Sequence, residues 1–508
     1  MTIIKLLCSP PLHLSVMTSR FVENQLQSVA ILIASDAMSI TPRPSFVLCV
    51  VTLLLMVTAC APFAPPERAA QSAPMPSAYL HPSSEARYPK SWWQAFDAPE
   101  LNALVEEALG NNFSLRESWA RLRQAEALVI RSRADSYPDL SLDGSSSVGQ
   151  RQTANGQRTT AREESYALGL SSGYEIDLWG RINSMRQAEL LEAMATREEL
   201  NAAAITLAAN VTTRWIGIIA QRLQRALVEA QLKANQTVLE LLELRFRKSL
   251  ASALDVLQQR QLVEQSRSQL PLIDQSEYQL LHELAVLLGR MPFSLPRIKH
   301  AAFDIPAGVP AAGLPAQLLA ARPDIRAARR RLESADWMVA AAKADRLPAI
   351  RLTAGATFQS SELNLLFDNW LVNLAAGLSA PLFDGRLRKA QIELREAVVA
   401  ADLASYRGVI LAAMREVEDA LVSEEKLREH LSGLAAQLEA ARLALNEARS
   451  RYLNGVADYL SVLTQLLSVQ NLERSQIQRR ADLLVARVDL YRALGGHWTD
   501  PLLPKPQN

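Results

Sequence analysis

The sequence predicts a mixed, mainly α-helical fold built from a duplicated unit of two strands followed by two long helices. The main observation is an internal repeat at an offset of 206 residues: Arg245-Phe246 returns as Arg451-Tyr452, and Leu288-Gly289 returns as Leu494-Gly495. Two further observations are paired strand patterns and very long stretches with almost no glycine or proline. An internal repeat of this length dictates the architecture before any single motif is considered.

The composition allows a large core and argues against nucleic acid as a partner. Of 508 residues, 49% are hydrophobic and 21% are charged, and 54 basic residues nearly balance 53 acidic ones, for a net charge of +1. A nucleic-acid-binding protein would carry a basic footprint. We expect a first repeat at 91–300 and a second repeat with a C-terminal tail at 301–508, together forming one body.

The N-terminal region carries an export signal that ends in a cysteine. Residues 46–59 form an apolar run, which is shorter than the roughly 20 residues of a membrane span and typical of a signal peptide. The run ends in Val57-Thr58-Ala59-Cys60, which resembles the lipobox of bacterial lipoproteins, where cleavage precedes a cysteine that is then acylated. We therefore predict a signal peptide within 1–59 and lipidation of Cys60.

The sequence on either side of this signal predicts an extension before it and a tether after it. Residues 1–37 do not resemble part of a signal peptide, and a start at Met38 would suffice, so we expect the natural start to lie later than residue 1. Residues 60–90 are rich in Pro, Ala and Ser, which predicts an extended tether. After cleavage Cys60 would be the only cysteine, so no internal disulfide is expected.

The sequence predicts two helices near the start of the mature chain and four strands, in two pairs, further along it. Pro99 marks the start of a first helix, and a second follows Asn112 and runs to about Ser136. The strand candidates, separated within each pair by polar sequence, are Leu140–Gly149 and Ser165–Asp177, then Ile350–Ser360 and Leu371–Phe383. Large residues alternate with small or polar ones at a period of two, and each strand is long enough to cross a bilayer when tilted.

Each strand pair leads into a very long helix and a returning helix. No proline occurs between Arg181 and about Leu250, nor between Leu387 and Asn454. At about 1.5 Å per residue such helices reach about 100 Å. We expect their charged residues to form solvated faces. The second carries a heptad seam, which predicts supercoiling against neighbouring helices: Leu427, Leu431, Leu434, Leu438, Ala441, Leu445, Ala448 and Tyr452.

Four strands of spanning length cannot lie in a bilayer alone, because both edges of their sheet would expose unpaired backbone groups to lipid. Even a small barrel needs about eight strands. Several chains must therefore contribute to one closed barrel. The helices are too polar to lie in lipid, so we expect them to project from the barrel as antiparallel hairpins into the periplasm.

Motifs spread over nearly the whole chain after residue 60 resemble those of one family. They are the lipobox at Cys60, Trp92-Trp93, the segment from Tyr174 to Arg181, Arg322-Pro323-Asp324-Ile325, the segment from Pro381 to Arg386, and the segment from Arg451 to Leu460. In this order they resemble the TolC-like outer-membrane factors, specifically the NodT-type outer-membrane lipoproteins of tripartite efflux systems with an RND transporter.

The resemblance implies a homotrimer with a twelve-stranded barrel, four strands per chain, and a periplasmic helical barrel closed at its far end. It implies three kinds of partner: a periplasmic adaptor, an inner-membrane RND transporter and outer-membrane lipid. It implies no cofactor. The six histidines show no metal-ligand spacing, and no phosphate-binding glycine loop or nucleophile motif stands out, so we expect neither a metal site nor an enzyme.

The resemblance also places a gate at the tip of the second hairpin, formed by Arg451, Tyr452, Asp458 and Leu460. An arginine at this tip would hold neighbouring helices by charge-assisted hydrogen bonds that break on opening, and leucine side chains would narrow the pore. The alternative is an ordinary solvated arginine and a core leucine. In many relatives an aspartate follows this stretch and forms an anionic ring, but here Thr464 occupies that position.

The two hairpin tips are also the expected docking surface for the adaptor. The residues in question are Lys248, Ser249 and Leu250 in the first hairpin and Asn454, Gly455 and Val456 in the second. The leading hypothesis is thus a passive exit duct of an RND-type efflux pump with a periplasmic gate. The alternatives are the outer-membrane duct of a type I protein secretion system and a lipid-anchored periplasmic coiled-coil scaffold.

Overall fold

The computed structural model describes residues 62–65, 76–81, 91–155, 157–300, 302–303, 309–496 and 498–499. The expected signal peptide, Cys60 and most of the tether lie outside these residues. Residues 61–508 form one compact unit, so the two repeats are not separate domains.

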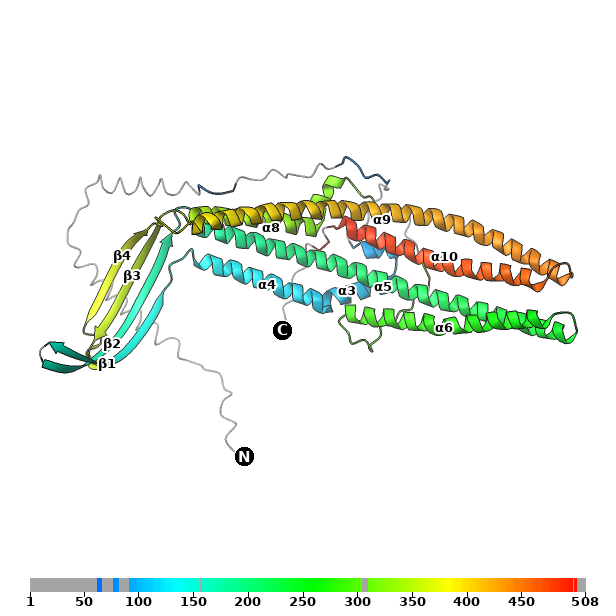
Figure 1. The fold of residues 1–508 in the computed structure, drawn as a ribbon, viewed down its shortest axis with the longest axis horizontal. Helices are drawn as coiled ribbons and strands as arrows, with labels where there is room; N and C mark the ends of the chain where they lie inside the picture. Colours follow the sequence, from blue (N-terminus) through cyan, green and yellow to red (C-terminus); the bar gives the residue numbers. More distant parts are fainter. Residues whose placement is uncertain are drawn as a thin grey trace, which may run out of the picture. The chain divides into compact units, whose positions relative to one another are not determined.

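The four strands form one antiparallel sheet with the order β1-β2-β3-β4 (Figure 1). Pairing of β2 with β3 joins the two repeats, from Tyr166 opposite Ser360 to Ile176 opposite Ile350. The strands are β1 (Ser141–Asn155), β2 (Gln157–Ile176), β3 (Ala349–Ser360) and β4 (Trp370–Ser379). Within the described residues, β1 and β4 each keep one edge without a strand partner.

Three strand boundaries differ by more than one residue from the sequence-based expectation: the end of β1, the start of β2 and the end of β4. The polar stretch after Gly149 was expected to separate two strands, yet β1 and β2 remain paired up to Asn155 opposite Gln157. Polar side chains favour exposure, but backbone pairing does not depend on side-chain polarity. β4 ends at Ser379 rather than at Phe383, and Pro381 beyond it has no N–H to donate to a ladder.

The two faces of the sheet differ as the alternation predicted. One face carries large apolar side chains, including the cross-strand pair Leu168 and Phe358 and the pair Ile350 and Leu378. The other face carries small and polar residues, including Gly169 opposite Thr357 and Glu175 opposite Arg351. The sheet is therefore amphipathic across its thickness.

The helices form two long hairpins, and shorter helices precede each strand pair. The first repeat contains η1 (Trp92–Phe96), α3 (Pro99–Asn111), α4 (Phe113–Ala134), α5 (Arg181–Arg247) and α6 (Ala253–Leu287). The second contains η2 (Pro315–Gln317), α7 (Leu318–Ala321), α8 (Pro323–Ala344), η3 (Leu363–Leu365), α9 (Leu387–Leu453) and α10 (Tyr459–Leu494). Both α5 and α9 have 67 residues, and α9 begins 206 residues after α5.

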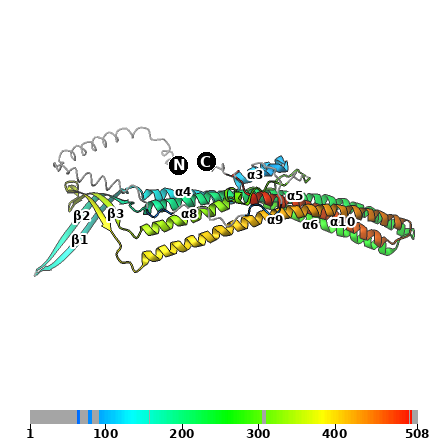
Figure 2. The same ribbon diagram turned by 90° about the horizontal axis from the view of Figure 1, so that it is seen from above.

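Helices α5 and α6 form the first hairpin and α9 and α10 the second, and both hairpins turn at the helix ends farthest from the sheet (Figures 1 and 2). Asp177 accepts hydrogen bonds from the backbone N–H groups of Ile182 and Asn183, and Asp384 accepts one from Arg388. These aspartates cap the first turns of α5 and α9.

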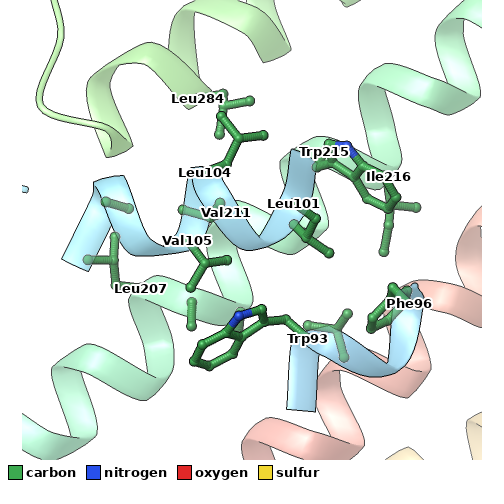
Figure 3. Close-up of a cluster of buried hydrophobic side chains, with 14 of the residues drawn as sticks. Trp93, Phe96, Leu101, Leu104, Val105, Leu207, Val211, Trp215, Ile216 and Leu284 are labelled. Atoms are coloured by element: carbon green, nitrogen blue, oxygen red, sulfur yellow. The ribbon is translucent and has the colours of Figure 1, made fainter. Parts of the chain in front are cut away.

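The largest core lies midway along the hairpins, where η1 and α3 pack on α5, α6 and α10. Figure 3 shows Leu104 of α3 pointing toward Leu284 of α6, with Trp215 of α5 nearby. The Trp92 ring stacks on Tyr491 of α10 at a centroid distance of 5.3 Å. This core joins the first repeat to the last helix of the second.

The junctions at which the shorter helices meet the hairpins repeat in detail. In the first repeat the Asn112 side chain donates to the carbonyl of Leu287 at 2.9 Å. In the second, the Arg322 guanidinium donates to the carbonyl of Ala493 at 3.0 Å and also binds Asp324 and Glu416. The Arg322-Pro323-Asp324 motif thus begins α8 and also fastens it to α10.

One expectation about charge is wrong. Not all charged residues of the long helices form solvated faces, because Glu424 of α9 is 1% exposed and Arg487 of α10 is 3% exposed. Arg487 Nε donates to Glu424 Oε2 at 2.8 Å, and Arg428 donates to the same carboxylate. Pairing is what permits these charges to be buried, because an unpaired buried charge is very costly.

Candidate functional site at the hairpin tips

The turn of each hairpin presents polar and apolar side chains to solvent. In the first hairpin Lys248 and Ser249 are exposed and Leu250 is 64% exposed. In the second, Asn454 and Gly455 are exposed and Val456 is 66% exposed. All six residues predicted for adaptor docking therefore lie on the surface of the two turns.

The two turns use the same backbone conformation with different residues. Gly455 has φ of 74° and Ser249, at the equivalent position, has φ of 60°. Positive φ is unstrained for glycine and costs about 1–2 kcal/mol for other residues. The first turn is therefore the more strained of the two.

Tyr452 lies between the two hairpins. The guanidinium of Arg245, on α5, lies over the Tyr452 ring at 5.0 Å from the ring centroid. The rings of Tyr452 and Tyr459 contact each other edge-on, with centroids 5.5 Å apart. Burial raises the pKa of the Tyr452 phenol; the positive charge of Arg245 opposes this rise without cancelling it, and nearby Asp255 adds to it. Arg245 was not among the residues predicted for the gate. Its position in the repeat, equivalent to that of Arg451, was the signal that could have identified it.

Arg451 and Leu460 face solvent in the single chain. Within the described residues, no carboxylate forms an ion pair with Arg451, and Leu460 is 53% exposed. Thr464, which stands where many relatives carry an aspartate, donates to the carbonyl of Leu460 at 2.8 Å. The structure thus leaves Arg451 and Leu460 free to meet another chain, whereas Tyr452 is already engaged.

Asp458 begins the returning helix. Its carboxylate accepts from the backbone N–H of Ser461 at 3.2 Å and from the Ser461 hydroxyl at 2.9 Å, which is the geometry of an N-cap. Ser252 caps α6 at the equivalent place, with Asp255 completing a capping box. Asp458 therefore has a defined role in setting the start of α10.

Four buried side chains from three helices, beginning at the start of α10, form what we call the amide cluster: Asn235 of α5, Gln259 of α6, and Gln470 and Tyr459 of α10. Gln470 donates to Asn235 Oδ1 at 2.9 Å, and Gln259 donates to the Asn235 carbonyl at 2.7 Å. The Tyr459 hydroxyl donates to Gln259 Oε1 at 2.6 Å. Each of the four is at most 3% exposed. Sequence reasoning missed the cluster, because polar residues on a long helix are usually solvated.

The polar face of the sheet borders a cavity of about 940 Å³. Its lining includes Asp143, Glu175, Arg351 and Asn373, together with the small residues Gly169 and Gly173. Glu175 forms ion pairs with Arg181 and Arg351 at 2.8 Å and 3.6 Å. A water-filled interior suits this face, since its groups are polar and the opposite face is apolar.

Comparisons with known proteins agree with this geometry. The profile of the outer membrane efflux protein family matches residues 104–290 and 314–496. The chain is 35% identical over 463 residues to the pyoverdine export outer membrane protein OpmQ of Pseudomonas putida, covering 89% of this chain and 97% of that protein. It is 34% identical to outer membrane protein OprJ of Pseudomonas aeruginosa, covering 80% and 86% of the two chains.

Solved structures show the same fold. The outer-membrane channel OprN superposes with a TM-score of 0.79 at 28% identity, covering 86% of this chain and 100% of that one. The structure of CusC superposes with a TM-score of 0.77 at 27% identity, covering 85% and 99%. The residues matched by the family profile include all four strands and both hairpins of the chain.

Proposed function

Because this chain belongs to the outer membrane efflux protein family and is an outer-membrane efflux channel, we propose that three copies assemble into one closed exit duct. Each copy would supply four strands to a twelve-stranded barrel and two hairpins to a periplasmic helical tube. The observation that carries this proposal is the open sheet: within the described residues β1 and β4 each lack a partner on one edge. Pairing β4 of one copy with β1 of the next would satisfy both edges.

The exposure of α9 supports the same assembly. An 18-residue stretch of α9 is apolar enough to cross a membrane by length and composition, yet only 22% of it is buried in the single chain, compared with 61% for a similar stretch of α5. A helix that is apolar on an uncovered face needs another surface to cover it. A second copy of the chain would supply that surface.

The duct acts passively between partners. A periplasmic adaptor would bind the hairpin tips at Lys248, Ser249, Leu250, Asn454, Gly455 and Val456, and an RND transporter in the inner membrane would drive export. The chain itself would hydrolyse nothing and hold no cofactor or metal. Its polar barrel face would let water and small solutes pass to the outside.

The gate would close the tube at the tip of the second hairpin. Arg451 and Leu460, which face solvent in the single chain, would meet the neighbouring copies near the axis. Tyr452 would hold the second hairpin to the first through its contact with Arg245. Asp458 would contribute by fixing where α10 starts, and Thr464 would leave the constriction without an added carboxylate.

Planar-bilayer recording of the purified protein tests this gate. The variant Arg451→Ala with Tyr452→Ala should open far more often than the wild type, because it removes both the inter-copy contact and the contact between hairpins. The variant Arg415→Ala, which changes an exposed arginine in the upper part of α9, is the matched control. Unchanged closure in the double variant would return Arg451 and Tyr452 to a purely structural role.

Two further measurements test the assembly and the anchor. Unheated protein should migrate as a trimer in detergent gels, and heating should shift it to a monomer; a heat-independent monomer would reject the duct and favour the scaffold. Replacement Cys60→Ala should abolish acylation by fatty acid, whereas acylation that persists in this variant would reject Cys60 as the lipid attachment site.

A further inference from the structure

Buried polar groups connect the two hairpins, and the contact between Asn235 and Gln470 lies only a few turns above the tip. Asn235 lies 12 residues before the end of α5 at Arg247, and Gln470 lies 11 residues after the start of α10 at Tyr459. At about 1.5 Å per residue this level is about 18 Å from the hairpin turns. Beyond it, a carboxylate of Glu473 accepts from the Gln231 side chain at 3.1 Å.

Each member of the amide cluster is satisfied by a partner on another helix. The side-chain oxygen of Asn235 accepts a hydrogen bond from Gln470, and its backbone carbonyl accepts one from Gln259. The side-chain nitrogen of Asn235 donates to the hydroxyl of Ser266 at 3.1 Å. A fully satisfied buried network specifies one arrangement, because any shift leaves dry polar groups unpaired. Sliding or rotating α10 across α5 at this level would therefore break several bonds together.

Below this level the contacts between hairpins are of a different kind. They consist of the apolar tip core, which includes Leu242, Val462 and Leu466, and the edge contacts of Tyr452 with Arg245 and Tyr459. Such contacts are less directional than amide hydrogen bonds, so small displacements cost less. The difference in contact chemistry divides the hairpins into two parts. The part at Asn235 and Gln470 is held in one register by hydrogen bonds, whereas the part nearer the tip can move apart at a lower cost in free energy.

The cluster also breaks the symmetry of the repeat. The position equivalent to Asn235 in α9 is Ala441, and the one equivalent to Gln231 is Gln437, which is exposed. The second hairpin therefore cannot build the same network around α9. Among the described residues of the second hairpin, α10 is the helix that is fastened to the first hairpin in this way.

We propose that the amide cluster is the fulcrum of the gate, with Asn235 and Gln259 as positioning residues that confine opening to the helical turns below it. This inference rests on the proposed gate and adds where its moving segment ends. Above the cluster, α10 stays on the first hairpin while the tip opens. At the lower end of the cluster, Tyr459 links Gln259 to the ring of Tyr452 and so to the closed tip.

Hydrogen–deuterium exchange on the full-length purified trimer tests the fulcrum without relying on conduction. In the wild type, amides below Asn235 and Gln470 should exchange at least tenfold faster than those above, with a step at the cluster. In Asn235→Ala, which installs the residue of the second repeat, the step should move toward the middle of the hairpins. The control Gln437→Leu should leave it in place.

A paired replacement separates positioning from simple stabilisation. Asn235→Leu with Gln470→Leu removes both partners of one hydrogen bond, so it should restore thermal stability relative to Asn235→Ala. The exchange step should nevertheless stay displaced, because apolar contact does not fix one register. A wild type without a step, or a step that stays at the cluster in these variants, would overturn the fulcrum.

Cross-linking locates the moving segment directly. A short bis-maleimide between cysteines at Arg245 and Tyr452, below the cluster, should abolish openings in planar bilayers. The same reagent between cysteines at Gln224 and Arg474, above it, should leave opening frequency within twofold of the uncross-linked protein; Gln224 donates to the Arg474 carbonyl at 2.7 Å. Loss of opening from the upper link would overturn the fulcrum. A wild type that never conducts would instead reject the duct, and the exchange step would still decide the fulcrum.

Discussion

The first and second hairpins have the same length and register but are held by different chemistry. Helices α5 and α9 both have 67 residues, and their returning helices start at equivalent positions. In the middle of the first hairpin, Ile218 and Leu281 are buried in the apolar core. The equivalent positions of the second carry the buried pair Glu424 and Arg487. One backbone thus accepts either an apolar contact or an ion pair.

The difference shows what duplication conserves and what it leaves free. Lengths, caps and turn geometry are retained, since each is set locally and a change would shift a whole helix. Side chains facing the neighbouring helix can diverge as long as each buried group has a partner. The buried pair is a directional contact that helps to fix the register of α9 on α10, at a level where the first hairpin has the apolar residues Ile218 and Leu281 instead.

The largest expected effect comes from breaking the pair. Glu424→Leu leaves the Arg487 guanidinium buried without its main partner and should lower the free energy of unfolding by about 3–5 kcal/mol. Glu424→Ile with Arg487→Leu, which installs the residues of the first hairpin, should be neutral or stabilising. Thermal unfolding followed by circular dichroism checks both. Equal losses in the single and double variants would mean that the two hairpins are not interchangeable here.

The glycines that end the returning helices come next. A Cβ atom at Gly495 would lie 2.8 Å from the carbonyl oxygen of Ala321, and one at Gly289 would lie 2.4 Å from that of Asn111. Both also have positive φ. Alanine at either should cost about 1–3 kcal/mol. At Gly455, where φ is positive but a Cβ meets open space, alanine should cost only about 1–2 kcal/mol. Unfolding midpoints rank the three.

Loss of a helix cap should have a smaller and equal effect in the two hairpins. Asp458→Ala and Ser252→Ala should each cost about 1 kcal/mol, and Asp458→Asn should cost much less, since asparagine also caps. Faster amide exchange in the first turn of α10 or α6 would report the loss. If Asp458→Asn alters the ion selectivity of the channel as strongly as Asp458→Ala, its charge faces the pore and acts beyond the cap.

The smallest effect concerns pH. Burial raises the pKa of Tyr452, so its neutral form is favoured in the folded tip. This contribution is complete below the ordinary phenol pKa of about 10 and is lost as pH rises through the higher folded value. Openings of the wild type should therefore become more frequent above pH of about 10. In Tyr452→Phe, which has no phenol at this position, the increase should be smaller; an identical pH profile would exclude Tyr452 as its source.

The spacing of apolar residues, together with the places where proline and glycine occur, was enough to predict the repeat, the four strands and both hairpins. The predicted helix starts at Arg181 and Leu387 are confirmed, because aspartate caps and the absence of proline act locally. The predicted extent of β1 and β2 was too short, since backbone pairing continues through a polar stretch. The gate and docking residues remain predictions that the described surface positions support.

Only the tertiary structure decided which polar side chains are buried and what they bind. Asn235, Gln470, Glu424 and Arg487 belong to residue types that are usually solvated, although each lies seven positions from a buried apolar residue on its own helix. Their spacing is compatible with burial, but it does not identify their partners. Their partners lie tens to hundreds of residues away in the chain, on helices whose facing sides are set by packing of the hairpins. The sequence repeat therefore specifies the scaffold of this channel. The contacts between the two repeats depend on how the helices pack, because burial is a property of the assembled helices.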